Sequence, residues 1–432
     1  MPVRRSHPQR VRRAPALAAV GTVLALSVTA LAGPLGPASA DPVARAKDRP
    51  IASSPKVRFA TFNASLNRGA QGELAADLAS GDDEQAANVA ETIQRTRPDV
   101  LLINEFDYDR KAVARFRKNY LARSQNGARP ITYRHYFVAP SNTGVPSGHD
   151  LDNNGEVGGG NDAFGFGNFE GQYGMLVLSK YPIRKQFART FQTFRWADMP
   201  GALLPDDPAT EAPADWYSEE ELADVRLSSK SHWDLPIRIG REVVHFLVSH
   251  PTPPTFDGPE DRNGLRNHDE IRFWADYVAG GATASYIYDD DGEAGGLPRG
   301  ESFVIAGDQN ADPRDGDSVD AAIDQLLDHP RVLDPKPRSA GGVEAVDQGG
   351  LNAEHRANPA FDTADFADNP PGNLRVDYVL PSRGTTIGRA RVFWPTDAGR
   401  YYYLTGDYDP EQWPGTGVPT SDHRLVWVDL RF

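Results

Sequence analysis

Apolar and polar residues alternate along residues 57–63, and a two-residue period of this kind predicts a β-strand. Residues 86–93 follow a different pattern, because their apolar side chains recur every three or four positions, which predicts a helix that ends before Pro98. The continuous apolar run at residues 100–103 then predicts a buried strand. The chain therefore opens with a strand, helix and strand unit, which indicates an α/β fold.

Further short apolar runs, each ending beside polar residues, predict strands at 175–178, 243–250, 303–306, 376–380 and 425–430. The segments between them are long and rich in Gly, Pro, Asn and Asp, at 140–174, 200–234, 251–267 and 312–373. No repeat and no clear linker divides them. We therefore expect residues 56–432 to form one α/β domain whose long inserted loops build a surface that faces the substrate.

The first 40 residues differ from the rest of the chain. Five arginines precede an apolar run at 16–32, and the small residues Ala38, Ser39 and Ala40 follow it, which predicts a signal peptide over residues 1–40 and a secreted, extracellular protein. The run is too short and too rich in Ala and Gly to serve as a membrane anchor. Residues 41–55 lack periodicity and predict a flexible leader, while the export route stays open between Sec and twin-arginine.

Composition narrows the possible chemistry. The chain has no cysteine, which excludes disulfides, thiolate metal sites and a cysteine nucleophile. Its formal net charge is -14, and it becomes more acidic still without the five arginines of residues 1–40. Such a chain does not show the basic surface expected of a protein that binds long nucleic acid through its phosphates, but it suits divalent cations.

Polar side chains that could carry chemistry stand at the ends of the predicted strands. Asn63 and Glu105 end the first two strands, and if these strands are parallel, both side chains lie at one edge as oxygen ligands for magnesium or calcium. Alone, each has a simpler explanation as a turn residue or a solvated strand end. His250 ends a later strand, and a terminal histidine by itself indicates packing as readily as catalysis.

Two further groups follow the same rule. Asp308 and Asn310 come directly after the strand at 303–306, where they could hold an attacking water and a phosphoryl oxygen, or simply close the strand with an Asx turn. Asp422 and His423 precede the last strand, and Asp377 could accept the second imidazole proton of His423 and fix its orientation.

Seven segments, taken in order, resemble the endonuclease/exonuclease/phosphatase superfamily of deoxyribonuclease-like metal-dependent phosphohydrolases. They are VRFATFN (57–63), PDVLLINE (98–105), YGMLVLSKYPI (173–183), HFLVSH (245–250), FVIAGDQN (303–310), RVDYVL (375–380) and SDHRLVWVDL (421–430). Each segment alone is a weak signal, but their order along nearly all of residues 56–432 is specific.

The resemblance implies a four-layered α/β sandwich with two facing mixed β-sheets. It implies a divalent metal, most often magnesium with calcium or manganese as alternatives, held by Asn63, Glu105 and Asp422. It also implies that Asp308 and Asn310 position the water and the scissile phosphate, and that His250 contacts the phosphate or the leaving group. The residues implied to act on the phosphate are therefore His250, Asp308, Asn310, Asp377 and His423.

Three features of the loops remain open at this stage. Arg262, Arg266 and His268 could grip a substrate phosphate, or could be the charged start of a helix that continues through residues 271–278. The aromatic residues interleaved with glycine at 161–174 could form a stacking platform or pack the loop onto the body. The acidic residues from Asp150 match the opening of a calcium loop without its closing glutamate, and a flexible acidic loop is the alternative.

Together these features predict a secreted, divalent-metal-dependent phosphoester hydrolase in which water attacks phosphorus. Its substrate could be a phosphorylated small molecule, a lipid head group or nucleic acid, and the acidic balance favours the first two. An extracellular nuclease that cleaves DNA or RNA is one alternative, and a non-catalytic binding protein on the same fold is another. Nothing in the sequence implies an obligate protein partner, so we expect a monomer.

Overall fold

The computed structural model describes residues 55–432. The predicted signal peptide and all but the last residue of the predicted leader lie outside the described residues. Among the described residues, no helix has both the length and the apolar character that a membrane span requires.

The first of two β-sheets has six strands in the order β10-β11-β1-β2-β4-β3. These strands are β1 (Val57–Leu66), β2 (Val100–Phe106), β3 (His135–Phe137), β4 (Met175–Ser179), β10 (Thr386–Val392) and β11 (Val426–Arg431). β1 and β2 run parallel, with Phe59 opposite Val100, and the other neighbouring strands are antiparallel. The parallel pairing on which the predicted Asn63 and Glu105 site depends is thereby confirmed.

The second sheet has five strands in the order β5-β6-β7-β8-β9. These strands are β5 (Arg189–Thr190), β6 (Trp233–Ile239), β7 (Glu242–Val248), β8 (Ser302–Asp308) and β9 (Asp377–Pro381). Only β7 and β8 are parallel, and β8 pairs with β9 so that Asp308 stands opposite Asp377. Both sheets are mixed, as the resemblance implied.

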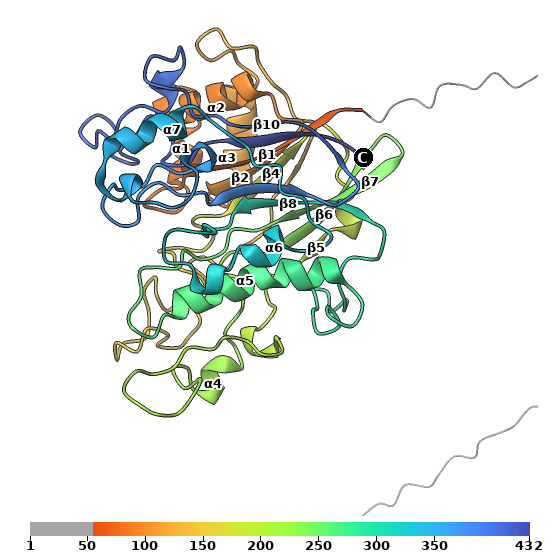
Figure 1. Ribbon diagram of the computed structural model, residues 1–432, viewed down its shortest axis with the longest axis vertical. Helices are drawn as coiled ribbons and strands as arrows, with labels where there is room; N and C mark the ends of the chain where they lie inside the picture. The colour runs from red at the N-terminus through yellow and green to blue at the C-terminus, as the bar shows by residue number, and fades with distance from the viewer. Residues whose placement is uncertain (1–54) are drawn as a thin grey trace, which may run out of the picture. The chain divides into compact units, whose positions relative to one another are not determined.

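Helices cover the outer faces of the two sheets. Those of the described residues are α1 (Glu73–Asp77), α2 (Glu84–Thr96), α3 (Arg110–Arg115), α4 (Glu219–Leu222), α5 (Arg262–Ala279), α6 (Asp324–Leu327) and α7 (Gly341–Glu344). Figure 1 shows α1, α2 and α3 beside the first sheet, and α5 with α6 beside the second. The order helix, sheet, sheet, helix is the predicted four-layered sandwich.

Three hydrophobic cores hold these layers together. Between the sheets, Phe59 of β1 meets Phe246 of β7 with ring centroids 5.4 Å apart. Val89 of α2 packs in a second core with the outer face of the first sheet, and Trp274 of α5 packs in a third with Ile305 of β8. β1 and β8 therefore bury both of their faces, which explains the largely apolar runs at these strands in the sequence.

The predicted helix at 86–93 is confirmed, and it begins two residues earlier, at Glu84, because Asp83 caps it. The Asp83 carboxylate accepts a hydrogen bond of 2.7 Å from the backbone N–H of Ala86. At the other end Arg97 adopts a left-handed conformation (φ 57°) just before Pro98, which cannot continue a helix. The chain then turns directly into β2.

The described residues form four strands that the sequence did not reveal, namely β3, β5, β6 and β10. β6 begins at the end of the segment 200–234, and Pro236 at its centre argues against a strand. The structure accommodates this proline because Pro236 pairs with His245 of β7 on one side, while β5 reaches only as far as Asp234 on the other. β3, β5 and β10 were also not predicted, since they are short or carry few apolar residues.

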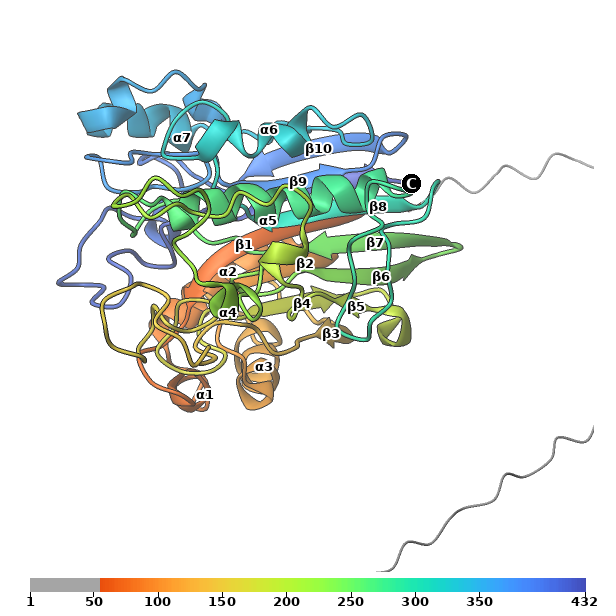
Figure 2. The same cartoon turned by 90° about the horizontal axis from the view of Figure 1, so that it is seen from below.

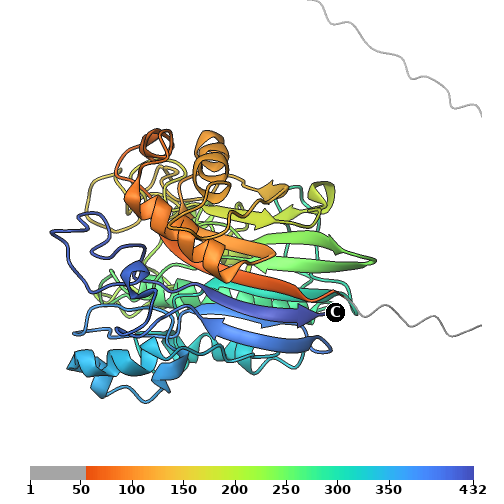
Figure 3. The same ribbon diagram turned by 90° about the horizontal axis from the view of Figure 1, so that it is seen from above.

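The strand directions bring distant parts of the chain to one end of the molecule. β1 and β11 are antiparallel, with Val57 opposite Leu430, so the end of β1 and the start of β11 lie at the same edge. Figures 2 and 3 show long connecting segments gathered at that end, away from the C-terminus. The ends of β1, β2 and β8 and the starts of β9 and β11 therefore frame one surface.

Candidate active site

Asn63 joins the two sheets; it lies near the end of β1, which continues to Leu66 beyond the predicted strand end. Its side-chain amide donates hydrogen bonds to Glu105 Oε1 at 3.0 Å and to Asp308 Oδ2 at 3.1 Å. Glu105 lies in β2 with a left-handed backbone conformation (φ 57°), which is strained for a residue with a side chain. The structure thus brings together three residues that the sequence placed at separate strand ends.

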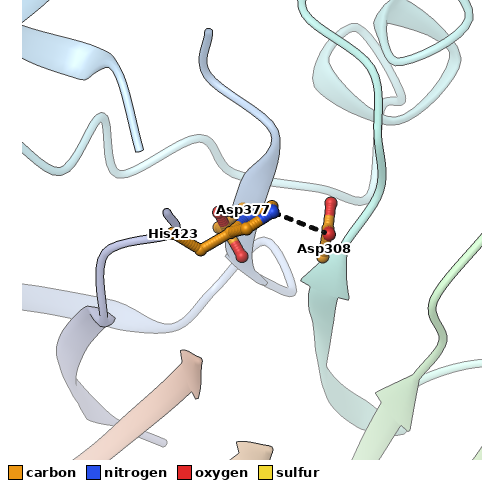
Figure 4. A group of neighbouring side chains, drawn as sticks. All are labelled: Asp308, Asp377 and His423. Carbon is orange, nitrogen blue, oxygen red and sulfur yellow. Dashed lines mark hydrogen bonds and ion pairs between the residues drawn. The ribbon is translucent and has the colours of Figure 1, made fainter. Parts of the chain in front are cut away.

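Asp308 is the point on which both histidines converge. Its Oδ2 lies 3.4 Å from His250 Nε2 and 3.6 Å from His423 Nε2, and all three side chains are buried. The partner of His423 on its other nitrogen is Asp377, whose Oδ2 lies 2.9 Å from Nδ1. Figure 4 shows His423 between the two carboxylates, reaching from the segment before β11 toward the end of β8.

These contacts fix the charges of the groups. Burial acts to raise the pKa of Asp308, but His423 and His250 outweigh it and hold that pKa below its usual value, so the carboxyl is ionised. Burial acts to lower the pKa of His423, yet Asp308 and Asp377 raise it well above its usual value. For His250, burial and the charge of Lys230 lower the pKa. Near neutral pH the site therefore holds one protonated and one neutral histidine.

Asp377 is held in place by a residue that the sequence did not single out. The hydroxyl of Thr363 donates to Asp377 Oδ2 at 3.0 Å and accepts from the backbone N–H groups of Val376 and Asp377. Burial raises the pKa of Asp377 despite the nearby His423. Thr363 had no distinguishing signal, because it stands in the long segment 312–373 without a regular pattern.

The two interpretations of the segment after β8, an Asx turn and a carboxylate directed at the site, are compatible. The backbone N–H of Asn310 donates to Asp308 Oδ1 at 2.9 Å, which is the Asx turn that the sequence allowed. The other carboxylate oxygen of Asp308 stays directed at the histidines. The Asn310 side chain donates to the carbonyl of Pro251 at 3.0 Å and so ties this turn to the segment after His250.

Asp422 is placed beside the site by a serine pair. Ser65 and Ser421 share a hydrogen bond of 3.0 Å between their hydroxyls, which joins the end of β1 to the segment before β11. The Asp422 carboxylate acts electrostatically on His423 and is partly exposed. All eight strand-end residues predicted from the sequence therefore lie in one region, although their individual roles stay predictions.

The residues present fit a divalent cation on the Glu105 side. The two oxygens of Glu105 accept hydrogen bonds only from the amides of Asn63 and Asn67, at 3.0 and 2.9 Å, and no ion pair to this carboxylate occurs in residues 55–432. Oxygen donors of this kind suit magnesium. Asp308, Asp377 and His423 also offer ligand atoms within 4.8 Å of one another. In that group, however, His423 already bridges the carboxylates.

Arg262, Arg266 and His268 all have partners within the chain. Arg262 pairs with Glu260, and His268 Nδ1 lies 3.1 Å from Asp269. Arg266 donates to the backbone carbonyls of Leu227, Phe164 and Arg226 at 2.9, 2.5 and 2.8 Å. The helix expected here is confirmed as α5, and a role of these three residues in substrate binding stays a prediction.

The acidic loop and the glycine-rich loop carry the two remaining predicted features. In the acidic loop, Asp150, Asp152 and Asp162 have carboxylate oxygens within 4.8 Å of one another, and Asn161 donates to Asp152 instead of closing the group. In the glycine-rich loop, Phe164 is buried, whereas Phe166 is 56% exposed. The aromatic residues of this loop therefore divide between packing and exposure.

The sequence of the chain matches the profile described as Endonuclease/Exonuclease/phosphatase family over residues 60–423. The chain belongs to this family. Its members are phosphoester hydrolases, so the chain is an enzyme of that class. None of the curated proteins compared with the chain matches it.

Among the solved structures similar to the chain are three of low sequence identity. An endonuclease/exonuclease/phosphatase from Beutenbergia cavernae is 15% identical, with a TM-score of 0.45 over 87% of this chain and 72% of that one. A mannosyl-6-phosphatase from Bacteroides thetaiotaomicron is 10% identical, with a TM-score of 0.42 over 87% of this chain and 100% of that one. Sphingomyelinase C from Streptomyces griseocarneus is 15% identical, with a TM-score of 0.42 over 87% and 99%.

Proposed function

We propose that the protein is a secreted, divalent-metal-dependent hydrolase of small phosphoesters or phosphorylated head groups. The observation that carries this proposal is the ionised Asp308 between two buried histidines, at 3.4 and 3.6 Å, with Asn63 linking it to Glu105. Such a group combines a proton acceptor with positively charged and neutral donors around one point.

The proposed reaction is attack of water on phosphorus. Asp308 accepts the proton of the attacking water, and protonated His423 donates a hydrogen bond to a phosphoryl oxygen as negative charge increases there. Asp377 keeps the imidazole of His423 oriented and charged, and His250 binds the phosphate or the leaving group. Asn63, Glu105 and Asp422 would hold magnesium, which supplies further stabilisation of the phosphoryl charge when bound.

The charge of the chain supports a small substrate over a long polyanion. The net charge is -14, and the three basic side chains at the start of α5 are engaged in contacts within the chain. Binding of long nucleic acid rests mainly on phosphate neutralisation by free Lys and Arg. We therefore place phosphorylated small molecules and lipid head groups before DNA and RNA.

A substrate panel tests this order. The panel contains phosphate monoesters, diesters, phospholipids, plasmid DNA and RNA, each with magnesium, calcium or manganese. We expect metal-dependent release from a monoester, a diester or a phospholipid head group at a higher kcat/KM than from nucleic acid. Preferred cleavage of plasmid DNA or RNA would overturn the substrate class, and no hydrolysis across the panel would favour a binding protein.

Secretion is supported by the arginines, apolar run and small-residue motif of residues 1–40. Expression of the full chain in a bacterium with its own export systems should yield processed protein outside the cytoplasm, with a new N-terminus near Asp41. Unprocessed chain confined to the cell would contradict this part of the proposal.

A further inference from the structure

Lys230 lies in a fixed segment directly before β6. The five residues from Ser228 to His232 are all buried. The backbone N–H of Asn142 donates to the carbonyl of Lys230 at 2.8 Å. Ser229 is bound to Glu270 of α5 through both its backbone N–H and its hydroxyl, at 2.7 and 3.1 Å. The backbone around Lys230 is therefore anchored on both sides.

The ammonium group of Lys230 has no partner in the structure. Only 7% of the residue is exposed, and none of the hydrogen bonds and ion pairs found within residues 55–432 involves its Nζ. The nearby Glu270 already accepts from Ser229 with one oxygen and from Thr252 with the other. An ammonium that is mostly buried and lacks a partner is unfavourable, and an anion bound beside it would relieve that cost.

The segment of Lys230 lies against the strand end that carries His250, because the hydroxyl of Ser229 donates to the backbone carbonyl of His250 at 3.4 Å. The charges that act on Lys230 include those of Glu105 and Asp308, and Lys230 in turn lowers the pKa of His250. Burial lowers the pKa of Lys230 itself, while these carboxylates act to raise it. Lys230 is thus close enough to Glu105, Asp308 and His250 for electrostatic interaction with each of them.

We propose that Lys230 is a substrate-binding residue whose ammonium binds a non-bridging oxygen of the phosphoryl group. An anion at this point supplies the missing partner, and an ammonium beside a phosphate makes a strong, charge-assisted hydrogen bond. A metal ion cannot supply that partner, because it repels the ammonium. This inference rests on the proposed function, since it takes the anion to be the substrate phosphate.

Two neutral variants, Lys230→Met and Lys230→Gln, test the proposal against a structural role, with Lys180→Met as the matched control. Lys180 pairs with Asp99 at 2.9 Å, and Asp99 precedes β2 at the opposite edge from the site. The full chain is used with magnesium present, and inorganic phosphate is the probe. Its affinity is measured by calorimetry and by the rise in unfolding temperature that it causes.

We expect both neutral variants to bind inorganic phosphate about tenfold to a hundredfold more weakly than the wild type. Their unfolding temperature without phosphate should be unchanged or higher, because an unpaired buried charge is gone. Lys230→Arg should recover part of the affinity, and Lys180→Met should bind as the wild type does. Activity on the best panel substrate should fall mainly through kcat/KM.

Phosphate affinity within twofold of the wild type in both neutral variants would overturn the proposal. Failure of both to fold would overturn it too, since an ammonium without a partner cannot support the fold to that extent. If the wild type is active and the variants bind phosphate equally well, the role of Lys230 is refuted and the proposed function is not. A wild type without hydrolase activity refutes the proposed function, while phosphate binding still reports on Lys230.

Discussion

Replacement of Asp308 by Asn removes the carboxylate on which the two histidines converge while it preserves the shape of the side chain. At 3.6 Å from His423, and with an effective dielectric constant of about 20, the lost attraction is roughly 5 kcal/mol before desolvation. The variant also lacks the proposed proton acceptor, a role worth about a hundredfold to ten-thousandfold in rate. We therefore expect Asp308→Asn to lower kcat by about a thousandfold or more.

The fold should survive this change, because Asn can still accept the backbone hydrogen bond of Asn310. Phosphate release from the best panel substrate is measured together with circular dichroism and thermal unfolding. Asp317→Asn is the matched control, since it removes an exposed carboxylate from the same connection after β8. A rate for Asp308→Asn within tenfold of the wild type would refute the assignment of Asp308 as the centre of the site.

Three further predictions concern the metal, the arginine at α5 and a buried acid. A chelator should abolish activity. Glu105→Gln should raise the magnesium concentration for half-maximal activity at least about tenfold in a metal titration, and an unchanged magnesium concentration would place the metal elsewhere. Arg266→Met should lower the free energy of unfolding, measured in urea, by about 2 to 4 kcal/mol, because three backbone carbonyls lose their donor. The same variant should change KM little, and a large rise in KM at unchanged stability would instead support a role of Arg266 in substrate binding. Burial, with Asp312 and Asp315, raises the pKa of Asp362 to about 8, so the folded protein keeps a proton that the unfolded chain releases above about pH 4, and this stability is lost as the pH rises toward 8. Asp362→Asn should therefore raise the unfolding temperature at about pH 8 and not at about pH 4, and an equal effect at both values would contradict the shift.

The sequence sufficed for the part of the site that depends on strand ends. Asn63 and Glu105 end apolar runs, and the rule that neighbouring parallel strands end at one edge places them together without any knowledge of distances. The rule does not bring Asp308 to them, because β8 belongs to the other sheet. The same reasoning could not choose between an Asx turn and a catalytic carboxylate at Asp308. In the structure Oδ1 closes the Asx turn, while Oδ2 lies beside His250 and His423.

The site residues that could not be predicted from the sequence were missed for a common physical reason. Thr363 and Asn67 bind carboxylates 14 and 38 residues away in the chain, and Lys230 interacts electrostatically with carboxylates of other elements. None of the three directly follows a predicted strand. Lys230 lies directly before β6, and β6 was not predicted because Pro236 lies at its centre. Their importance becomes visible only when burial and partners are known.

The source of the oxygen in the released phosphate tests the central claim most directly. The best panel substrate is hydrolysed in water labelled with heavy oxygen, with and without magnesium, and both products are analysed by mass spectrometry. Water attack at phosphorus puts the label in the phosphate product, and only when the metal is present. Label in the alcohol product, or equal turnover without any divalent metal, would contradict the proposed function.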